Sequence, residues 1–188
     1  MSRKGEGMPG RRQMMAGMAA FALTALPARS ALIQSRFEGI GQRFLWVKQA
    51  GRWEELQTAF RDAEGRLIED GLRYLSWIFR DWKDHDTGIW MDYRLFDLLA
   101  AIQTEATIEA DFPVRITLTS GYRTARRNRR IEGAAFNSQH IRGRAADISL
   151  TGIPHAMTAR IADRLGAHGL GRYAHFTHVD VGDPGRRW

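Results

Sequence analysis

The first half of the chain places its hydrophobic residues at helical spacing. Apolar positions recur every three or four residues in two stretches, 67–79 and 93–108, which predicts two amphipathic helices. Asp92 has the residue type and the position of an N-cap for the second helix. A short apolar run at 44–47 predicts a strand ahead of both. We therefore expect residues 31–112 to form a mainly helical part of the fold.

After residue 113 the period shortens to two, and β-branched residues become frequent. The segment 154–166 keeps helical spacing, and Gly169-Leu170-Gly171 predicts a turn. Three segments alternate as strands do: 114–119, 145–150 and 176–181. This order of elements predicts an α+β fold in which a small antiparallel sheet has flanking helices.

The first thirty residues have the pattern of an export signal. Arg11 and Arg12 precede an uncharged apolar run of about thirteen residues, which is shorter than the roughly 20 residues that span a bilayer. Small residues follow at the spacing that a signal peptidase requires. The arginine pair resembles a twin-arginine signal, with a general secretory signal as the alternative. We expect residues 1–30 to be a signal peptide, and 31–188 to be a single domain without a transmembrane anchor, exported to the periplasm or the extracellular space.

The composition excludes cysteine chemistry and shows where the basic charge lies in the chain. The 188 residues include no cysteine, which excludes disulfides, Cys-ligated zinc, iron–sulfur clusters and thiol catalysis. Any metal site must therefore be built from His, Asp and Glu. The formal net charge is +7, but the first thirty residues hold five basic residues and one acidic residue. Much of the basic charge thus belongs to the expected signal.

Candidate metal ligands lie at the loop-to-strand junctions of the second half. His140 and Asp147 lie seven residues apart, and Asp147 falls inside an expected strand. His178 and Asp180 lie two apart in another strand, so their side chains share a face. Two histidines and one carboxylate supply three ligands and leave a fourth position for water, as a catalytic zinc requires. On spacing alone, ordinary core or surface histidines and a turn-forming aspartate remain the alternative.

Several spaced motifs in the second half occur together in one known family. They are Ser120-Gly121-Tyr122-Arg123, Asn137-Ser138-Gln139-His140, Ala145-Ala146-Asp147-Ile148, Gly171-Arg172-Tyr173, His178-Val179-Asp180 and Arg187-Trp188. In this order they resemble the D-alanyl-D-alanine zinc metallopeptidases of the peptidase M15 family, in the carboxypeptidase-like branch and especially the exported YcbK-like murein peptidases. Phe79-Arg80-Asp81-Trp82 and the segment 92–99 extend the resemblance over nearly all of residues 31–188.

The resemblance implies a hedgehog/D-Ala-D-Ala-peptidase-like zinc fold, with the metal site of one zinc ion in residues 113–188. His140, Asp147 and His178 would bind the metal. Arg123 would hold a substrate carboxylate or steady an oxyanion, because a guanidinium fork matches two oxygens; a surface salt bridge is its alternative. Ser138 would shape the substrate side of the loop before His140.

The resemblance leaves the general base open. Related metallopeptidases place a Glu or His two or three residues before the last zinc ligand, and here Phe176 and His175 occupy those positions. His175 can transfer protons near neutral pH, but in a regular strand it would point to the face opposite His178. His175 is the candidate base, with a base elsewhere as the alternative. Asp180 would orient a metal-bound imidazole or form a hydrogen bond at the strand end.

The expected function is an exported zinc-dependent metallopeptidase that hydrolyses stem-peptide or cross-link amides of peptidoglycan, with endopeptidase activity favoured over D,D-carboxypeptidase activity. A zinc-activated water would attack the amide. The alternative is a catalytically inactive, zinc-stabilised cell-wall-binding domain. The arginines in the segment 123–130 raise nucleic-acid binding as a third hypothesis. Because no nucleic-acid motif accompanies them, peptidoglycan is the expected partner and nucleic acid is not.

Overall fold

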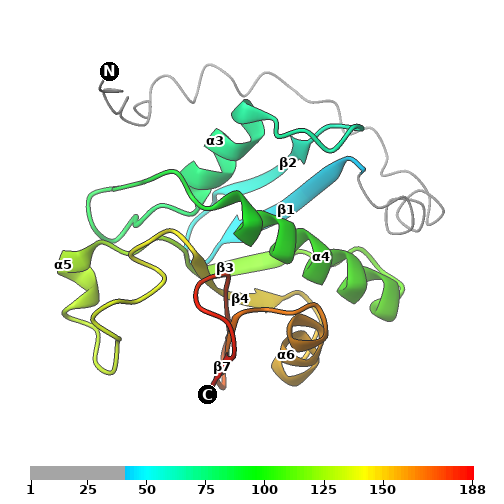
Figure 1. Ribbon diagram of the computed structural model, residues 1–188. Coiled ribbons are helices and arrows are strands. Elements are labelled where there is room, and N and C mark those ends of the chain that lie inside the picture. The colour runs from blue at the N-terminus through cyan, green and yellow to red at the C-terminus, as the bar shows by residue number, and fades with distance from the viewer. Residues whose placement is uncertain (1–40) are drawn as a thin grey trace.

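A seven-stranded mixed sheet organises residues 41–188, the part of the chain that the computed structural model describes (Figure 1). Its strands lie in the order β2-β1-β3-β4-β6-β5-β7. The strands are β1 (Arg43–Gln49), β2 (Glu55–Arg61), β3 (Ile116–Ser120), β4 (Ala145–Leu150), β5 (Gly169–Arg172), β6 (Thr177–Asp180) and β7 (Arg186–Arg187). The helices are α3 (Glu69–Ile78), α4 (Tyr93–Ala110), α5 (Ala125–Asn128) and α6 (His155–Arg164).

The export signal expected at 1–30 lies outside the described residues. Within 41–188, no helix has both the length and the apolar character needed to cross a membrane.

The α+β class is confirmed, but the expectation of a small antiparallel sheet was wrong. Most neighbouring strands are antiparallel, whereas β1 pairs with β3 and β5 pairs with β7 in parallel. Parallel neighbours need a crossover connection, and α3 and α4 lie in the connection between β1 and β3. Local patterns could not reveal this pairing, because its partners Val47 and Ile116 are distant in sequence. The segment expected to be mainly helical therefore also supplies two strands.

Helical spacing located three of the helices correctly. α3 and α4 occupy the two amphipathic stretches, and the carboxylate of Asp92 accepts a hydrogen bond from Arg94 N at the start of α4. α6 follows directly after Pro154, in the third stretch. α4 and α6 contact each other, and both pack against β4, whereas α3 packs against β2 (Figure 1). The apolar helix faces that were predicted from the sequence therefore pack against the sheet.

The turn expected at Gly169-Leu170-Gly171 was also wrong, because these residues form β5. Glycine weakens a strand unless another group must approach its backbone closely. A Cβ atom on Gly169 would collide with the carboxylate of Asp180 on the paired strand β6. A Cβ atom on Gly171 would lie 2.6 Å from Nε1 of Trp188. Both glycines therefore serve close packing on one face of the sheet rather than a change of chain direction.

Strands β4 and β6 separate a hydrophobic face from a polar face. Ala146 pairs with Val179, and both side chains are fully buried in the hydrophobic core. The next pair along the ladder is Asp147 with His178, whose side chains point to the other face because successive residues alternate. The register that buries the core thus sets these two polar side chains opposite each other.

A buried arginine links the first hairpin to the segment after α3. Arg80 is 1% exposed and donates two hydrogen bonds to the carboxylate of Glu54, at 2.7 and 2.8 Å. Its Nε donates to Asp86 at 2.8 Å, and its guanidinium lies 4.3 Å from the ring centroid of Trp77. The hydrogen bonds from Arg80 lower the pKa of Glu54 to about 2. A buried guanidinium is tolerated only when it is paired in this way.

This network also fixes the backbone beside the polar face of β4. Phe79 O accepts a hydrogen bond from Tyr122 N at 2.7 Å, and the carboxylate of Asp81 accepts one from Thr124 N at 2.9 Å. Arg80 lies between these two anchors in sequence. The loop that follows β3 is therefore held at both ends against the segment that Arg80 positions.

We expect Glu54→Gln to lower the free energy of unfolding by about 2 kcal/mol at pH 7, because Arg80 loses a charged hydrogen-bond partner. The pKa of Glu54 is depressed in the folded state, so its contribution is complete above its unfolded pKa of about 4.5. That contribution disappears as the pH falls toward 2. Denaturant unfolding at several pH values should therefore show the gap between wild type and variant narrowing below pH 5.

Glu64→Gln is the matched control, because the Glu64 side chain is 64% exposed and pairs only with an exposed arginine. Surface pairs of this kind contribute about 0–1 kcal/mol. A gap for Glu54→Gln that stays constant from pH 7 to pH 2 would contradict the assignment.

Candidate metal centre

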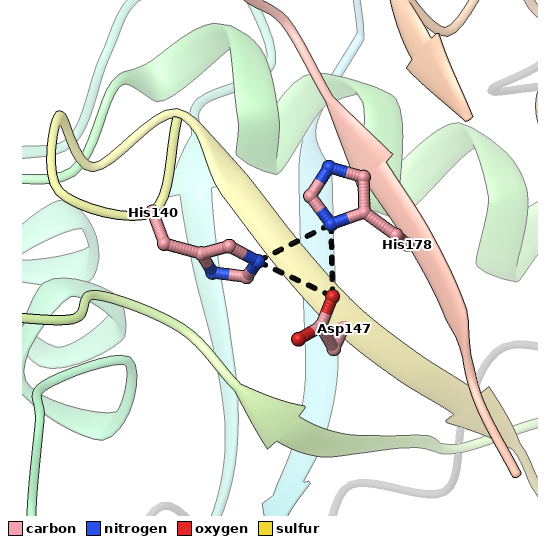
Figure 2. Close-up of side chains that lie close together, drawn as sticks. All are labelled: His140, Asp147 and His178. Atoms are coloured by element: carbon pink, nitrogen blue, oxygen red, sulfur yellow. Dashed lines mark hydrogen bonds and ion pairs between the residues drawn. The ribbon is translucent and has the colours of Figure 1, made fainter. Parts of the chain in front are cut away.

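Three of the sequence-predicted residues meet on the polar face of the sheet (Figure 2). His140 lies in the turn before β4, Asp147 lies in β4, and His178 lies in β6. His140 Nε2 is 3.2 Å from Asp147 Oδ1 and 3.2 Å from His178 Nδ1. His178 Nδ1 is 2.9 Å from Asp147 Oδ1. All three residues are buried, so these donor atoms form a small enclosed triangle.

Each imidazole is held through the ring nitrogen that faces away from this triangle. His140 Nδ1 donates to the carbonyl of Gly121 at 2.7 Å. His178 Nε2 donates to the carboxylate of Asp180 at 3.2 Å. A neutral imidazole has one N–H and one lone pair, so these bonds leave the lone pairs of His140 Nε2 and His178 Nδ1 facing each other.

The triangle fits a metal ion. Two lone pairs 3.2 Å apart beside a carboxylate oxygen repel one another unless a cation lies between them. Zinc bonds of about 2.0–2.1 Å in tetrahedral geometry put neighbouring ligand atoms about 3.3 Å apart, close to the distances between these atoms. Two imidazoles and one carboxylate suit divalent transition metals, zinc among them. Three protein ligands also leave a fourth position open.

The ionisation of the site favours binding of a cation. Burial works against the charged form of Asp147, yet the two neighbouring imidazoles hold its pKa below the usual range. Burial likewise opposes protonation of His178, but the carboxylates of Asp147 and Asp180 raise its pKa overall. The site therefore combines an ionised carboxylate with the His178 imidazole, which attracts positive charge either as a proton or as a metal ion.

Arg123, the residue expected to hold a substrate carboxylate or an oxyanion, lies next to Asp147 of the triangle. It is 8% exposed, and its Nη2 approaches Asp147 Oδ2 at 3.4 Å and Ser120 Oγ at 3.2 Å. Its Nη1 donates to Asn128 Oδ1 at 3.2 Å, while the buried Nε has no hydrogen-bond partner among residues 41–188. Burial lowers the pKa of Arg123, but an arginine side chain stays charged in proteins. The structure thus keeps a cation beside the site with unused hydrogen-bonding capacity.

The remaining predicted residues occupy different places. Ser138 Oγ accepts a hydrogen bond from His140 N at 3.3 Å, so Ser138 supports the turn that carries this histidine. Asp180 is fully buried and touches the His178 ring, as the shared strand face predicted. His175 lies exposed in the turn between β5 and β6. None of the polar contacts of the three clustered side chains within residues 41–188 involves His175.

Sequence reasoning missed two features of the site. The carbonyl of Gly121 orients His140, and a main-chain acceptor has no signature in side-chain spacing. The ring of Trp188 lies 5.1 Å from the His178 ring, centroid to centroid. The presence of both residues in the motifs was the only signal in the sequence, and it did not indicate their roles.

The chain is similar to known proteins over most of its length. A family model described as peptidoglycan L,D-endopeptidase MepK matches residues 39–188. The probable peptidoglycan L,D-endopeptidase MepK of Haemophilus influenzae is 32% identical over 152 residues, which cover 78% of this chain and 78% of the relative. The peptidoglycan L,D-endopeptidase MepK of Escherichia coli K12 is also 32% identical over 152 residues, covering 78% of this chain and 80% of the relative. The chain therefore belongs to the peptidoglycan L,D-endopeptidase MepK family of the M15 metallopeptidases.

Proposed function

We propose that the protein is an exported, zinc-dependent endopeptidase that hydrolyses cross-link amide bonds of peptidoglycan. The observation that carries the proposal is the buried triangle of His140, Asp147 and His178, whose lone pairs converge on one point. The two relatives are named as peptidoglycan L,D-endopeptidases, which supports peptidoglycan as the substrate. Residues 1–30 would direct export, and residues 31–188 would form a single catalytic domain.

His140 Nε2, Asp147 Oδ1 and His178 Nδ1 would hold one zinc ion. A zinc ion bound in this way polarises a carbonyl and activates a water molecule for attack on it. The carbonyl of Gly121 and the carboxylate of Asp180 keep both imidazoles in the tautomer that presents a lone pair to the metal. Such orienting partners raise the basicity of the ligand nitrogen and fix the plane of the ring.

Arg123 would stabilise negative charge on the substrate. Its guanidinium is held by Ser120 and Asn128, so little reorganisation is needed when a carboxylate or an oxyanion comes close. Because the group is nearly buried, its charge is screened less by water than a surface arginine would be. Ser138 would act on the same side of the site by holding the turn of His140.

His175 is our proposed proton acceptor. It lies in the turn that immediately precedes β6, three residues before His178, and it is exposed to solvent. A turn releases His175 from the strict alternation that would otherwise place it on the face opposite His178. His175 would then accept a proton at its imidazole from the face of the site that is open to solvent.

We expect His140→Ala to lower zinc affinity at least about 100-fold, because loss of a ligand exceeds the 10- to 100-fold effect of losing its orienting partner. Metal analysis of the purified chain should give about one zinc ion for wild type and much less for the variant. Incubation with purified peptidoglycan, followed by mass spectrometry of the released muropeptides, should show fragments only with wild type. His85→Asn, at an exposed histidine, is the control.

Zinc binding by wild type without any released muropeptide would contradict the enzyme proposal. That result would favour a zinc-stabilised wall-binding domain.

Asp180→Asn tests the orienting role without removing a ligand. The amide can donate to His178 Nε2 as well as accept from it, so the correct tautomer is no longer enforced. We expect a 10- to 100-fold loss of zinc affinity, measured by competition with a chelator. Asp183→Asn, at an exposed aspartate nearby, should bind zinc like wild type. Equal zinc affinity in both variants would remove Asp180 from the site.

His175→Gln should lower kcat about 10²- to 10⁴-fold if His175 carries the proton. Because His175 touches none of the proposed ligands, zinc content and thermal stability should stay at wild-type values. A kcat within about threefold of wild type would show that another group is the base.

A further inference from the structure

Three aromatic side chains stand together beside His178: Tyr173, Phe176 and Trp188. We name them the aromatic wall. The rings of Tyr173 and Phe176 are stacked with centroids 4.4 Å apart, and Trp188 Nε1 donates to the hydroxyl of Tyr173 at 2.6 Å. The Trp188 ring lies 5.1 Å from the His178 ring. The wall therefore adjoins the metal triangle at one proposed ligand.

The position of Trp188 is fixed by the backbone. Trp188 N donates to Leu170 O at 3.1 Å, and Arg172 N donates to Trp188 O at 2.9 Å. A Cβ atom on Gly171 would lie 2.6 Å from Trp188 Nε1 and 2.9 Å from a ring carbon of Tyr173. Glycine at position 171 of β5 therefore leaves room for the rings of Trp188 and Tyr173 to contact the strand. Such close packing indicates that the wall is built into the fold.

Much of the wall nevertheless faces solvent. Trp188 is 50% exposed and Tyr173 is 43% exposed. Aromatic rings fixed beside a polar site provide apolar contact area for a ligand at little further cost in conformational entropy. Because the Trp188 ring lies 5.1 Å from the His178 ring, its exposed surface lies beside the place where a scissile amide would meet the proposed ligands.

This proximity selects the part of the substrate that can occupy the wall. The glycan of peptidoglycan is separated from a cross-link by several stem residues, each of which extends about 3.3–3.6 Å. In a cross-link, by contrast, the amide nitrogen is carried at the far end of a diamino acid, whose methylene groups connect it to the stem. A methylene chain lies flat against aromatic rings and buries its apolar surface there.

The charges around the wall favour the amide over the free amine. The Arg186 guanidinium lies 6.0 Å from the Trp188 ring and 3.7 Å from the carboxylate of Asp180. Its cationic group repels the ammonium group of an uncross-linked diamino acid. An acylated nitrogen is neutral and avoids this repulsion. Hydrolysis would restore the ammonium group beside Arg186 and so favour product release.

Building on the proposed function, we propose that the aromatic wall is a subsite for the methylene chain attached to the scissile amide nitrogen. Trp188 would be the residue that determines the preference for cross-link amides over main-chain amides. Arg123 approaches the triangle at Asp147 and the wall approaches it at His178, so the two features would contact different parts of the substrate.

The test measures binding to the zinc-loaded full chain before any turnover is considered. The probes are N-alkyl amides of one stem tripeptide, with the alkyl chain lengthened from ethyl to pentyl. Wild type should bind about two- to fourfold more tightly for each added methylene. Trp188→Ala should abolish this dependence while it leaves zinc content and affinity for the ethyl amide near wild type. Trp53→Ala is the matched control, because Trp53 is 97% exposed in the β1–β2 turn.

Trp188→Phe retains an aromatic ring of smaller area. This variant provides the test if Trp188→Ala fails to fold. We expect a weaker dependence on chain length in this variant. Chain-length dependence equal to wild type in the folded Trp188 variants would overturn the proposal. Competition by a chitin disaccharide that requires Trp188 would also overturn it, because a sugar would then occupy the wall. Normal chain-length dependence without cleavage of peptidoglycan would contradict the proposed function and leave the subsite standing.

Discussion

The pairing of β4 with β6 is the constraint on which the site depends. One register buries Ala146 and Val179 under the helices and sets Asp147 opposite His178 on the other face. A slip of one residue would turn the polar pair into the core and the apolar pair outward. Burial of the apolar neighbours Ala146 and Val179 thus supplies free energy that holds the proposed ligands in place.

The rest of the site is positioned by main-chain contacts that extend this constraint. His140 joins the triangle because the Gly121 carbonyl holds its ring. Gly121 in turn packs closely against the backbone of Phe79, next to the buried Arg80. A Cβ atom at position 121 would collide with the Phe79 carbonyl. The ion pairs of the first hairpin therefore support the geometry of a site that they do not touch.

Local sequence patterns predicted the helices α3, α4 and α6 and the strands β3, β4 and β6, because each carries its own period. They failed at β5, where Gly169 and Gly171 signal a turn but serve close approach to Asp180 and Trp188. They also failed at the parallel pairing of β1 with β3, which depends on contacts distant in sequence. Spacing made His140, Asp147 and His178 candidates, and only the family motifs singled them out. No sequence pattern placed Trp188 beside His178.

The three donor atoms of the triangle face one another in an arrangement that a cation would stabilise. Two imidazole lone pairs and an ionised carboxylate face one another in a buried space, which costs free energy when no cation is present. The register of β4 and β6 and the anchored loop after β3 hold these donor atoms together despite the repulsion among them. A metal that binds the folded chain removes the repulsion and adds its binding free energy to stability. Metal binding at this triangle would therefore be coupled to folding, because the register that buries the core also brings the three donor atoms together.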